Sequence, residues 1–456
     1  MRGRSLPAWV AGAALALALS ACARVGMPDG PPPPRDLPPP SADRYPERAR
    51  PPAEAPWMAR APLPPALPPE TGDVRALWVV RTALLHPDSA RAAVRRAHEA
   101  GFNTLLVQVR GRGDAYYRSR YEAWPEPMDA SLRGEYDPLQ TVLDEARARG
   151  LRVHAWVNAH LVASAFLPPQ DPEHLVRRAP DLLAVPRPMA SRLFHMDPRD
   201  PAYLEALLEW SRENTDRVEG LYTSPTHPGI REHLAAVVGD LVERYPLDGV
   251  HLDYIRFPNS DFDFSRTVQE DFRAWVRRAT RIPPEELARA ESAWTRDPAA
   301  YADAFPEHWD DYRRMGLNRT VERLYWTVKD RRPGALVSVA VFPDPASARR
   351  DRMQDWEAWL RAGYAEVVAP MAYTNNREAF RRQISRAGEV AGPERVWAGV
   401  GIYQNTFQDA VEKTRTARVL GAGGTILFSY DWAVGPDGTR AAGGPYLTRF
   451  SRELWE

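Results

Sequence analysis

Short apolar runs alternate with amphipathic stretches along the whole chain after Glu70. Each run is nearly continuous, as expected of strands that are buried on both faces of a parallel sheet. The stretches between them repeat apolar residues at helical spacing, and several end at a glycine, which favours helix termination. The expected strands are Arg75–Val80, Thr104–Val109, Arg152–Asn158, Gly249–Ile255, Leu336–Phe342, Glu366–Tyr373, Val396–Tyr403 and Gly424–Asp431.

Eight strand–helix units in one stretch predict an α/β fold, the (β/α)8 TIM barrel. An open doubly wound sheet is the alternative, but it usually shows a Gly-rich phosphate loop after its first strand, and none follows here. The expected helices include Ser89–Ala100, Pro138–Arg149, Arg231–Arg244, Trp309–Arg331, Phe407–Leu420 and Tyr446–Trp455.

Two connections are much longer than the others. About ninety residues separate the third and fourth strands, and about eighty separate the fourth and fifth. In barrels such excess falls above the carboxyl ends of the strands, where active sites are built. We therefore expect a groove there, suited to an extended polymer.

The first seventy residues differ in composition from the rest. Residues 1–21 resemble a bacterial lipoprotein signal, with Arg2 and Arg4, an apolar run too short to span a bilayer, and Leu-Ser-Ala before Cys22. Lipidation of Cys22 would anchor the protein to a membrane, the outer membrane facing the periplasm in a Gram-negative cell. The alternative is a short N-terminal helix with an incidental buried cysteine.

Residues 22–70 are proline-rich, so they predict a disordered tether between the anchor and a folded domain at 71–456. A passive spacer without a length requirement is equally compatible with this composition. Sixty basic residues balance sixty acidic ones, which argues against electrostatic capture of nucleic acid. A single Cys excludes a disulfide framework and a Cys-based zinc site, and no cofactor is expected.

The fourth strand carries the strongest chemical signal, in the segment DGVHLDYIRFP. His251 and Asp253 share one face, so both can point into the barrel mouth. A carboxylate in an apolar strand is costly to bury unless it is paired, and Arg256 is the expected partner. Asp253 is thus a candidate nucleophile or base, and the alternative is a structural Asp–Arg pair.

Polar groups also follow the second and third strands. Arg110 ends the second strand, and the glycines after it allow Asp114 to turn back toward the mouth; a solvated turn is the alternative. Asn158 ends the third strand, where it can bind a sugar hydroxyl. His154 and His160 lie nearby, although a lone His is more often structural than functional.

Aromatic and amide side chains gather at the ends of the late strands. Rings stack on the apolar faces of sugars and amides bind their hydroxyls, so this set favours carbohydrate binding over ordinary aromatic packing. The candidate binding residues are Tyr373, Asn375, Tyr403, Tyr430, Asp431 and Trp432, together with Arg110, Asn158, His251 and Arg256.

A resemblance to the bacterial glycosyl hydrolase-like 10 family is carried by RALWVV, GFNTLLVQVRGRGDAYYRSRYEAW, YDPLQTVLDEARARGLRVHAWVN and LDGVHLDYIRFP, with weaker echoes in PMAY and ILFSYDW. It spans the chain from Asp73 onward. It implies a TIM-barrel glycosidase of the cell envelope, some relatives of which cleave peptidoglycan glycan strands, particularly strands without stem peptides. It also matches Asp253 to the family's strand-four Asp and Asp114 to its GDA-x-Y loop.

Two features depart from that family pattern. Members often carry a second acid after the strand-four Asp, where this chain has Tyr254, and the YIRFP ending is closer to a neighbouring putative glycosidase group. The segment His195–Arg217 looks inserted. These departures bear on the acid and base assignments more than on the fold.

Glycoside hydrolysis normally needs two carboxyl groups. Asp253 is the first candidate; Asp114, followed by Asp431 and Asp344, is the candidate proton donor. The expected function is an envelope glycoside hydrolase whose partner is a polysaccharide, and the alternative is a non-catalytic glycan-binding lipoprotein. A metal-dependent hydrolase would use His251, Asp253, His154 and His160, but the first strand lacks a His-x-His pair.

Overall fold

The computed structural model describes residues 73–278, 282–435 and 445–455. The predicted signal, Cys22 and the tether lie outside these residues. Eight parallel strands form the central sheet, and all eight were expected from the sequence. Their bounds are β1 Val74–Val79, β2 Thr104–Arg110, β3 Arg152–Asn158, β6 Gly249–Asp253, β7 Leu336–Val341, β8 Val367–Pro370, β9 Trp397–Gly401 and β10 Gly424–Phe428.

The sheet curves into a barrel. Its strand order is β8-β7-β6-β3-β2-β1-β10-β9, and a bridge between Val368 and Val396 joins the two outer strands. Every neighbouring pair is parallel, so all carboxyl ends meet at one rim, which we call the mouth. The predicted TIM barrel is confirmed.

The fourth strand and the last three end earlier than predicted. β6 stops at Asp253, two residues before Ile255, and β10 stops at Phe428, three before Asp431. The residues beyond these ends include buried apolar ones, Ile255 in the loop after β6 and Tyr430 at the start of α16 (Tyr430–Val434). Hydrophobicity alone therefore does not mark where these strands end.

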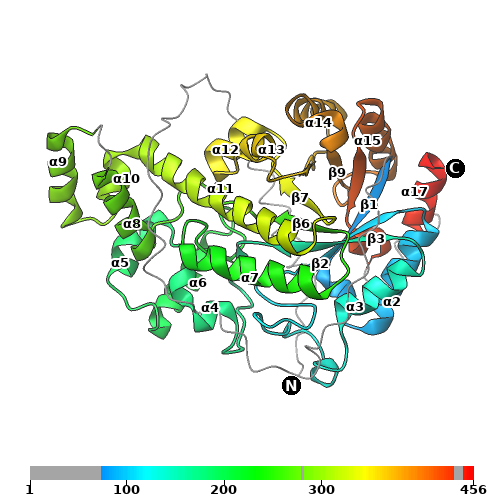
Figure 1. Cartoon of the computed structure of the whole chain (residues 1–456), viewed down its shortest axis with the longest axis horizontal. Helices are drawn as coiled ribbons and strands as arrows, with labels where there is room; N and C mark the ends of the chain where they lie inside the picture. Colours follow the sequence, from blue (N-terminus) through cyan, green and yellow to red (C-terminus); the bar gives the residue numbers. More distant parts are fainter. Residues whose placement is uncertain (1–72, 279–281, 436–444, 456) are drawn as a thin grey trace, which may run out of the picture.

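Helices follow the strands and pack outside the barrel (Figure 1). Several begin earlier than predicted because a proline occupies the first turn, where its missing N–H costs nothing. The helices that match the prediction are α2 Pro87–Glu99, α3 Pro138–Arg147, α7 Pro228–Arg244, α11 Pro306–Arg331, α15 Phe407–Val419 and α17 Tyr446–Leu454. The remaining ones on the barrel are α12 Pro345–Arg352, α13 Trp356–Ala362, α14 Arg377–Ala391 and α16 Tyr430–Val434.

Strand side chains alternate between two apolar layers. Leu77 and Val79 of β1 face outward and pack with helix residues such as Val94, whereas Ala76 and Trp78 face the barrel interior. Three tryptophans, Trp78, Trp156 and Trp397, fill much of that interior. The barrel is thus a packed core whose upper end forms the floor of the mouth.

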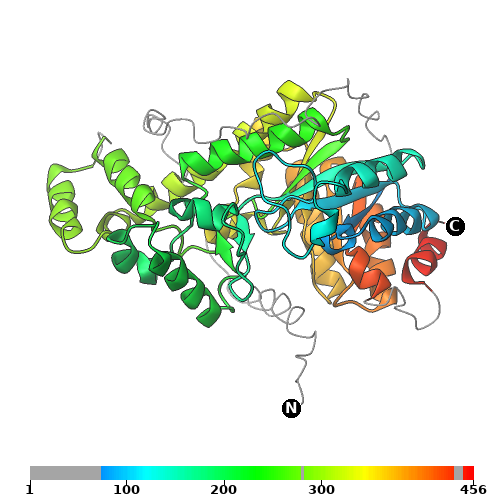
Figure 2. The same ribbon diagram turned by 90° about the horizontal axis from the view of Figure 1, so that it is seen from below.

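The two long connections form insertions on one side of the barrel (Figures 1 and 2). Helices α8 (Arg266–Arg277) and α10 (Ala300–Ala304) bury an aromatic core of their own together with the start of α11. This core includes Phe272 and Trp309. The first insertion, residues 159–227, contains β4 Leu161–Ala163, α4 Leu175–Arg178, α5 Ala190–Phe194, α6 Pro201–Glu213 and β5 Leu221–Tyr222. The second, residues 254–305, contains α8 Arg266–Arg277, α9 Pro284–Trp294 and α10 Ala300–Ala304.

The segment His195–Arg217, which looks inserted in the sequence, is largely α6. β4 and β5 pair as a small antiparallel sheet beside the mouth. Within the described residues, no helix combines the length and the apolarity needed to cross a bilayer.

Candidate active site

Asp253 ends β6 at the mouth of the barrel. One carboxylate oxygen accepts the backbone N–H of Tyr254 at 2.7 Å, and the other accepts the indole N–H of Trp156 at 3.1 Å. The residue is only 8% exposed, and this burial raises the pKa of the Asp253 carboxyl above its ordinary value. A raised pKa makes a carboxyl better suited to act as a general acid than an exposed carboxylate is.

The predicted pairing of Arg256 with Asp253 is wrong. The Arg256 guanidinium instead donates to Glu219 Oε1 at 2.8 Å and lies over the rings of Tyr254, at 4.6 Å, and Tyr222, at 5.6 Å. The charge of Arg256 still acts on Asp253, lowering its pKa less than burial raises it. Asp253 therefore keeps its carboxyl free of an ion pair among the described residues.

Glu219 is a second carboxylate at this site that sequence reasoning missed. The Tyr222 hydroxyl donates to its other oxygen at 2.8 Å. Burial acts to raise the pKa of Glu219, but the Arg256 guanidinium, the Tyr222 hydroxyl and the charge of Arg352 together outweigh it and hold the pKa below its ordinary value. The negative charge of Glu219 in turn helps to raise the pKa of Asp253, so the two carboxyls are electrostatic neighbours.

No strand end marks Glu219 in the sequence. It precedes β5, and the pairing of β5 with β4 folds this part of the first insertion back against the third strand's end. The only available signal was the acidic residue just ahead of LYTSP, which has no characteristic spacing. The tertiary contact with Arg256 is what identifies it.

Six aromatic side chains in mutual contact run from the barrel interior to the mouth, and we call them the aromatic cluster; one of them, Trp156, bonds Asp253. Tyr373 lies 5.3 Å from Phe428, 6.0 Å from Tyr403 and 6.2 Å from Trp78, measured between ring centroids. The Tyr403 hydroxyl is buried without a hydrogen-bond partner among the described residues. The cluster consists of Trp78, Trp156, Tyr373, Tyr403, Phe428 and Trp432.

Residues 73–417 match the sequence profile of the family described as Glycosyl hydrolase-like 10. The chain belongs to this family. It is 26% identical over 343 residues to "Glycosyl hydrolase DigH" of Escherichia coli (strain K12), a match that covers 70% of this chain and 62% of that protein. A match to "Glycosyl hydrolase YngK" of Bacillus subtilis (strain 168) is 24% identical over 297 residues and covers 60% and 46%. The chain thus spans less than two thirds of these relatives' lengths.

Solved structures share the fold of this glycosyl hydrolase-like 10 protein. The glycoside hydrolase domain of PgaB (BpsB) from Bordetella bronchiseptica superposes with a TM-score of 0.55 at 15% identity, covering 80% of this chain and 97% of that one. A β-galactosidase from Bacillus circulans sp. alkalophilus gives a TM-score of 0.53 at 12% identity, covering 84% and 56%. The likeness shows a barrel of the kind found in glycoside hydrolases.

The histidines of the barrel lie below the mouth. His251 Nε2 accepts the Trp78 indole N–H at 3.3 Å and its Nδ1 bonds Ser338 at 2.9 Å, so both nitrogens are engaged. Burial lowers the pKa of His251 to about 3, and likewise that of His154. A side chain at Gly249 would collide with the His154 ring, which is why glycine starts this strand.

His160, the fourth ligand of the hypothetical metal site, bonds Thr223 at 3.0 Å inside the first insertion. The four proposed ligands do not converge on one point. Among the described residues, no three His, Cys, Asp or Glu side chains are grouped as metal ligands.

Arg110 and Asn158 are buried beneath the mouth. The Arg110 guanidinium pairs with Glu122 at 2.8 Å and donates to the carbonyls of Asn158 and Ala159. The Asn158 amide donates to the Gly111 carbonyl at 2.8 Å, while its oxygen is buried without a partner among the described residues. These contacts fasten the second and third strands together, and they leave no Arg110 donor directed at a substrate.

The other predicted acids serve local structure. Asp114 Oδ1 accepts the backbone N–H groups of Gly111 at 3.2 Å and Arg112 at 2.7 Å, which closes its own turn. Asp344 is exposed and caps α12 through Ser347 at 2.7 Å. Asp431 accepts the Ser429 hydroxyl at 2.5 Å in the first turn of α16, and burial raises the pKa of its carboxyl.

The remaining predicted sugar-binding residues divide between the mouth and the outside. Tyr373, Tyr403 and Trp432 belong to the aromatic cluster. Tyr430 instead points to α2, where its hydroxyl accepts from Arg96 at 3.2 Å. Asn375 is exposed on the loop after β8.

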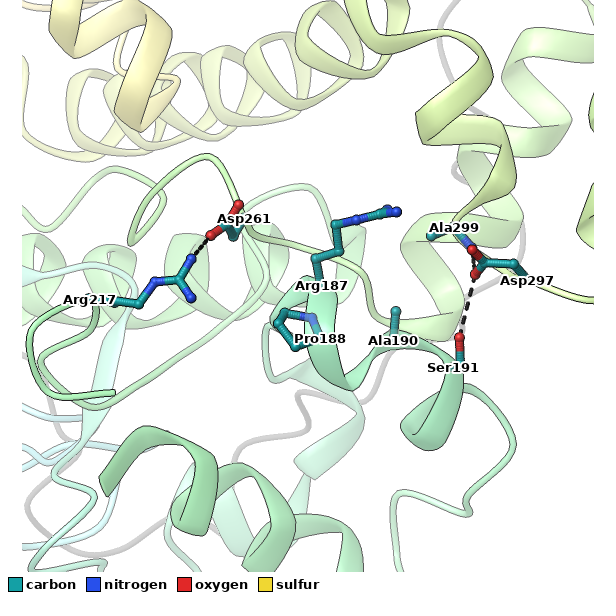
Figure 3. A pocket seen from close by; sticks show the side chains of 8 residues that line it. All are labelled: Arg187, Pro188, Ala190, Ser191, Arg217, Asp261, Asp297 and Ala299. Carbon is teal, nitrogen blue, oxygen red and sulfur yellow. Dashed lines mark hydrogen bonds and ion pairs between the residues drawn. The ribbon is translucent and has the colours of Figure 1, made fainter. Parts of the chain in front are cut away.

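A cavity of about 420 Å³ opens between the two insertions (Figure 3). Arg217 pairs with Asp261 at one side, and Ser191 donates to Asp297 at the other. Arg217 is two residues from Glu219 in the chain, so the same segment of the first insertion contributes to the cavity and to the site. Its lining residues are Arg187, Pro188, Ala190, Ser191, Arg217, Asp261, Asp297 and Ala299.

Proposed function

We propose that this protein hydrolyses the glycan strands of peptidoglycan after their stem peptides have been removed. One observation carries the proposal: the buried Asp253, whose pKa is raised, bonds Trp156 of the aromatic cluster and is an electrostatic neighbour of Glu219, whose pKa is lowered. Two carboxyls whose environments move their pKa values apart are the arrangement that glycoside hydrolysis uses. Membership of the glycosyl hydrolase-like family supports the reaction class.

The environments of the two carboxyls suggest their roles. In the proposed reaction, Asp253 donates its proton to the glycosidic oxygen as the bond from that oxygen to the anomeric carbon breaks. Glu219 takes a proton from a water molecule whose oxygen bonds to the same carbon. This proposal gives Asp253 the acid role rather than the predicted role of nucleophile or base. It makes Glu219, not Asp114, the second carboxyl, because Asp114 is engaged in its own turn.

The aromatic cluster and the cavity suggest how a polymer is held. Rings such as Tyr403 and Trp432 offer apolar faces to sugar units at the reaction centre. The cavity between the insertions extends the binding surface beyond Glu219, which suits a strand of several sugars. The barrel thus supplies Asp253, the first insertion supplies Glu219, and both insertions supply the length of the binding surface.

A second function is favoured by one specific observation. Arg256 forms an ion pair with the Glu219 carboxylate, and the Tyr222 hydroxyl donates a hydrogen bond to it. Both contacts stabilise the ionised form, so they weaken Glu219 as a base. In that case the protein grips envelope glycan without cutting it. Tight binding without product, unchanged in Asp253→Asn, would favour this non-catalytic function.

The test is incubation of the purified chain with intact and with amidase-stripped peptidoglycan, followed by mass spectrometry of released fragments. We expect sugar fragments from the stripped polymer and a loss of roughly 10²–10⁴-fold in rate for Asp253→Asn. Asp344→Asn, which changes an exposed carboxyl of a helix cap, is the matched control and should keep the rate. Full activity in Asp253→Asn would refute the assignment.

We also propose that Cys22 is lipidated and holds the catalytic domain at the envelope membrane through the proline-rich segment. The support is the sequence pattern before Cys22. Metabolic labelling with a fatty acid analogue and membrane fractionation test it. Labelled, membrane-bound protein that becomes unlabelled and released in Cys22→Ser is the expected result; an unlabelled wild-type chain would contradict it.

A further inference from the structure

The loop that follows β2 lies directly beside Asp253. Asn158, whose register partner in the barrel is Asp253, donates to the Gly111 carbonyl at 2.8 Å. Asp114 then fixes the turn by accepting the N–H groups of Gly111 and Arg112. These hydrogen bonds fix the backbone of Arg112 relative to Asn158, the neighbour of Asp253 in the sheet.

Two guanidinium groups meet at this loop, and we call Arg81 and Arg112 the arginine pair. Arg81 leaves the end of β1 and packs over Gly111 so closely that a Cβ there would collide with it. Its Nη1 donates to Gln108 at 3.0 Å. The charge of Arg81 adds to burial in lowering the pKa of Arg112, so each cation makes the other less favourable.

Among the described residues, Arg81 and Arg112, each partly buried, lack the carboxylate partner that three buried arginines near the barrel have. Arg110 pairs with Glu122, Arg256 with Glu219, and Arg313 with Asp310. Within the described part of the chain, neither Arg81 nor Arg112 has a carboxylate within ion-pair distance. The Arg112 guanidinium has no hydrogen-bond acceptor there at all.

The charged and titratable groups near the pair do not supply that partner. The negative charge of Asp114 acts to raise the pKa of Arg112, and the positive charge of Arg81 acts to lower the pKa of Asp431. Neither carboxylate is within ion-pair distance of its arginine among the described residues. Asp114 is engaged by two backbone N–H groups, and Asp431 by the Ser429 hydroxyl. Tyr116 and Tyr254, the other neighbours of Arg112, carry no charge at neutral pH, because burial raises the pKa of each hydroxyl.

We infer that Arg81 and Arg112 bind a carboxylate carried by the sugar next to the scissile bond. A guanidinium presents a planar set of donors that matches a carboxylate, and an anion would relieve the repulsion within the pair. This inference rests on the proposed function, under which the bound carboxylate is the lactyl carboxylate of a muramic acid residue. That carboxylate is free only when the stem peptide has been removed, because the peptide converts it to an uncharged amide. The pair thereby supplies a physical reason for preferring stripped strands.

The test compares stripped glycan strands with the same strands after chemical reduction of the lactyl carboxylate to an alcohol. Binding is measured by co-sedimentation and hydrolysis by fragment release, so that the two activities are read separately. We expect wild-type protein to bind and cleave the carboxylate form better. We expect Arg112→Met to lose roughly tenfold to a hundredfold in affinity for that form, and little for the reduced form.

Arg81→Met should show a similar but smaller effect because Arg81 also bonds Gln108. Arg350→Gln, a change at an exposed arginine, is the matched control and should behave as the wild type. Arg112→Met losing equally on both strands, or on neither, would overturn the inference. Carboxylate-selective binding without fragment release would keep the inference and refute hydrolysis instead.

Discussion

Two Arg–Glu pairs lie near the mouth of the barrel and differ in how far they are exposed. Arg110 and Glu122 are 0% and 1% exposed, and every neighbour is protein, including His233, whose Nε2 lies 2.7 Å from Glu122. Arg256 and Glu219 are 5% and 19% exposed, and both charges act on Asp253. The donor and acceptor distance is 2.8 Å in both.

The difference shows that an ion pair's role is set by its enclosure. The enclosed pair locks β2 to the end of β3, since Arg110 also donates to the Asn158 and Ala159 carbonyls. The rim pair holds an ionised carboxylate where a substrate can meet it. The same two residue types thus serve stability in one place and chemistry in the other.

The largest expected effect breaks the enclosed pair. Arg110→Met leaves the Glu122 carboxylate buried without its main partner, which should lower the free energy of unfolding by about 3–5 kcal/mol. Thermal unfolding followed by circular dichroism measures the drop in Tm. Arg256→Met is the matched variant and should lose less, because the partly exposed Glu219 can regain water. Equal losses in the two variants would contradict the distinction.

The next effect separates the two carboxylates by function. Glu219→Gln should lower kcat roughly 10²-fold, because the proposed base is removed, while Tm changes little. Glu122→Gln should have the opposite effect: kcat of the folded fraction should stay the same, and Tm should fall. Product anomers followed by NMR add a further readout, since activation of water by Glu219 inverts the configuration. Unchanged kcat in Glu219→Gln would remove it from the mechanism.

The smallest effect concerns pH. If Asp253 donates a proton, kcat/KM falls as pH rises through its raised pKa. The Trp156 indole N–H stabilises the ionised form, so Trp156→Phe should raise the pKa of Asp253 further and move this alkaline limb to higher pH. Trp78→Phe is the control, because its indole N–H bonds His251 instead. If the alkaline limb of the kcat/KM profile moves equally in both variants, or moves to lower pH in Trp156→Phe, Asp253 is not the acid.

Much of the fold could be predicted because barrel strands carry their signal locally. A strand buried on both faces must be apolar throughout, and all eight such runs became strands. Asp253 and the Tyr373, Tyr403 and Trp432 rings could also be found, since polar or aromatic residues at strand ends meet at one rim in a parallel barrel. Several strand ends were misplaced because loop residues over the mouth are equally apolar.

The sequence by itself determined the barrel and the strand that carries its reacting carboxyl, because those depend on periodicity and on position along a strand. Only the tertiary structure decided which charges meet. Arg256 pairs with Glu219, which is thirty-seven residues away in the chain, and not with Asp253, which is three residues away. The reason is that the pairing of β4 and β5 returns the first insertion to the mouth. Likewise Arg110 became enclosed while Arg112, two residues later, remained without an acidic partner in the described chain. Charge partners depend on distances between remote segments, which local pattern does not encode.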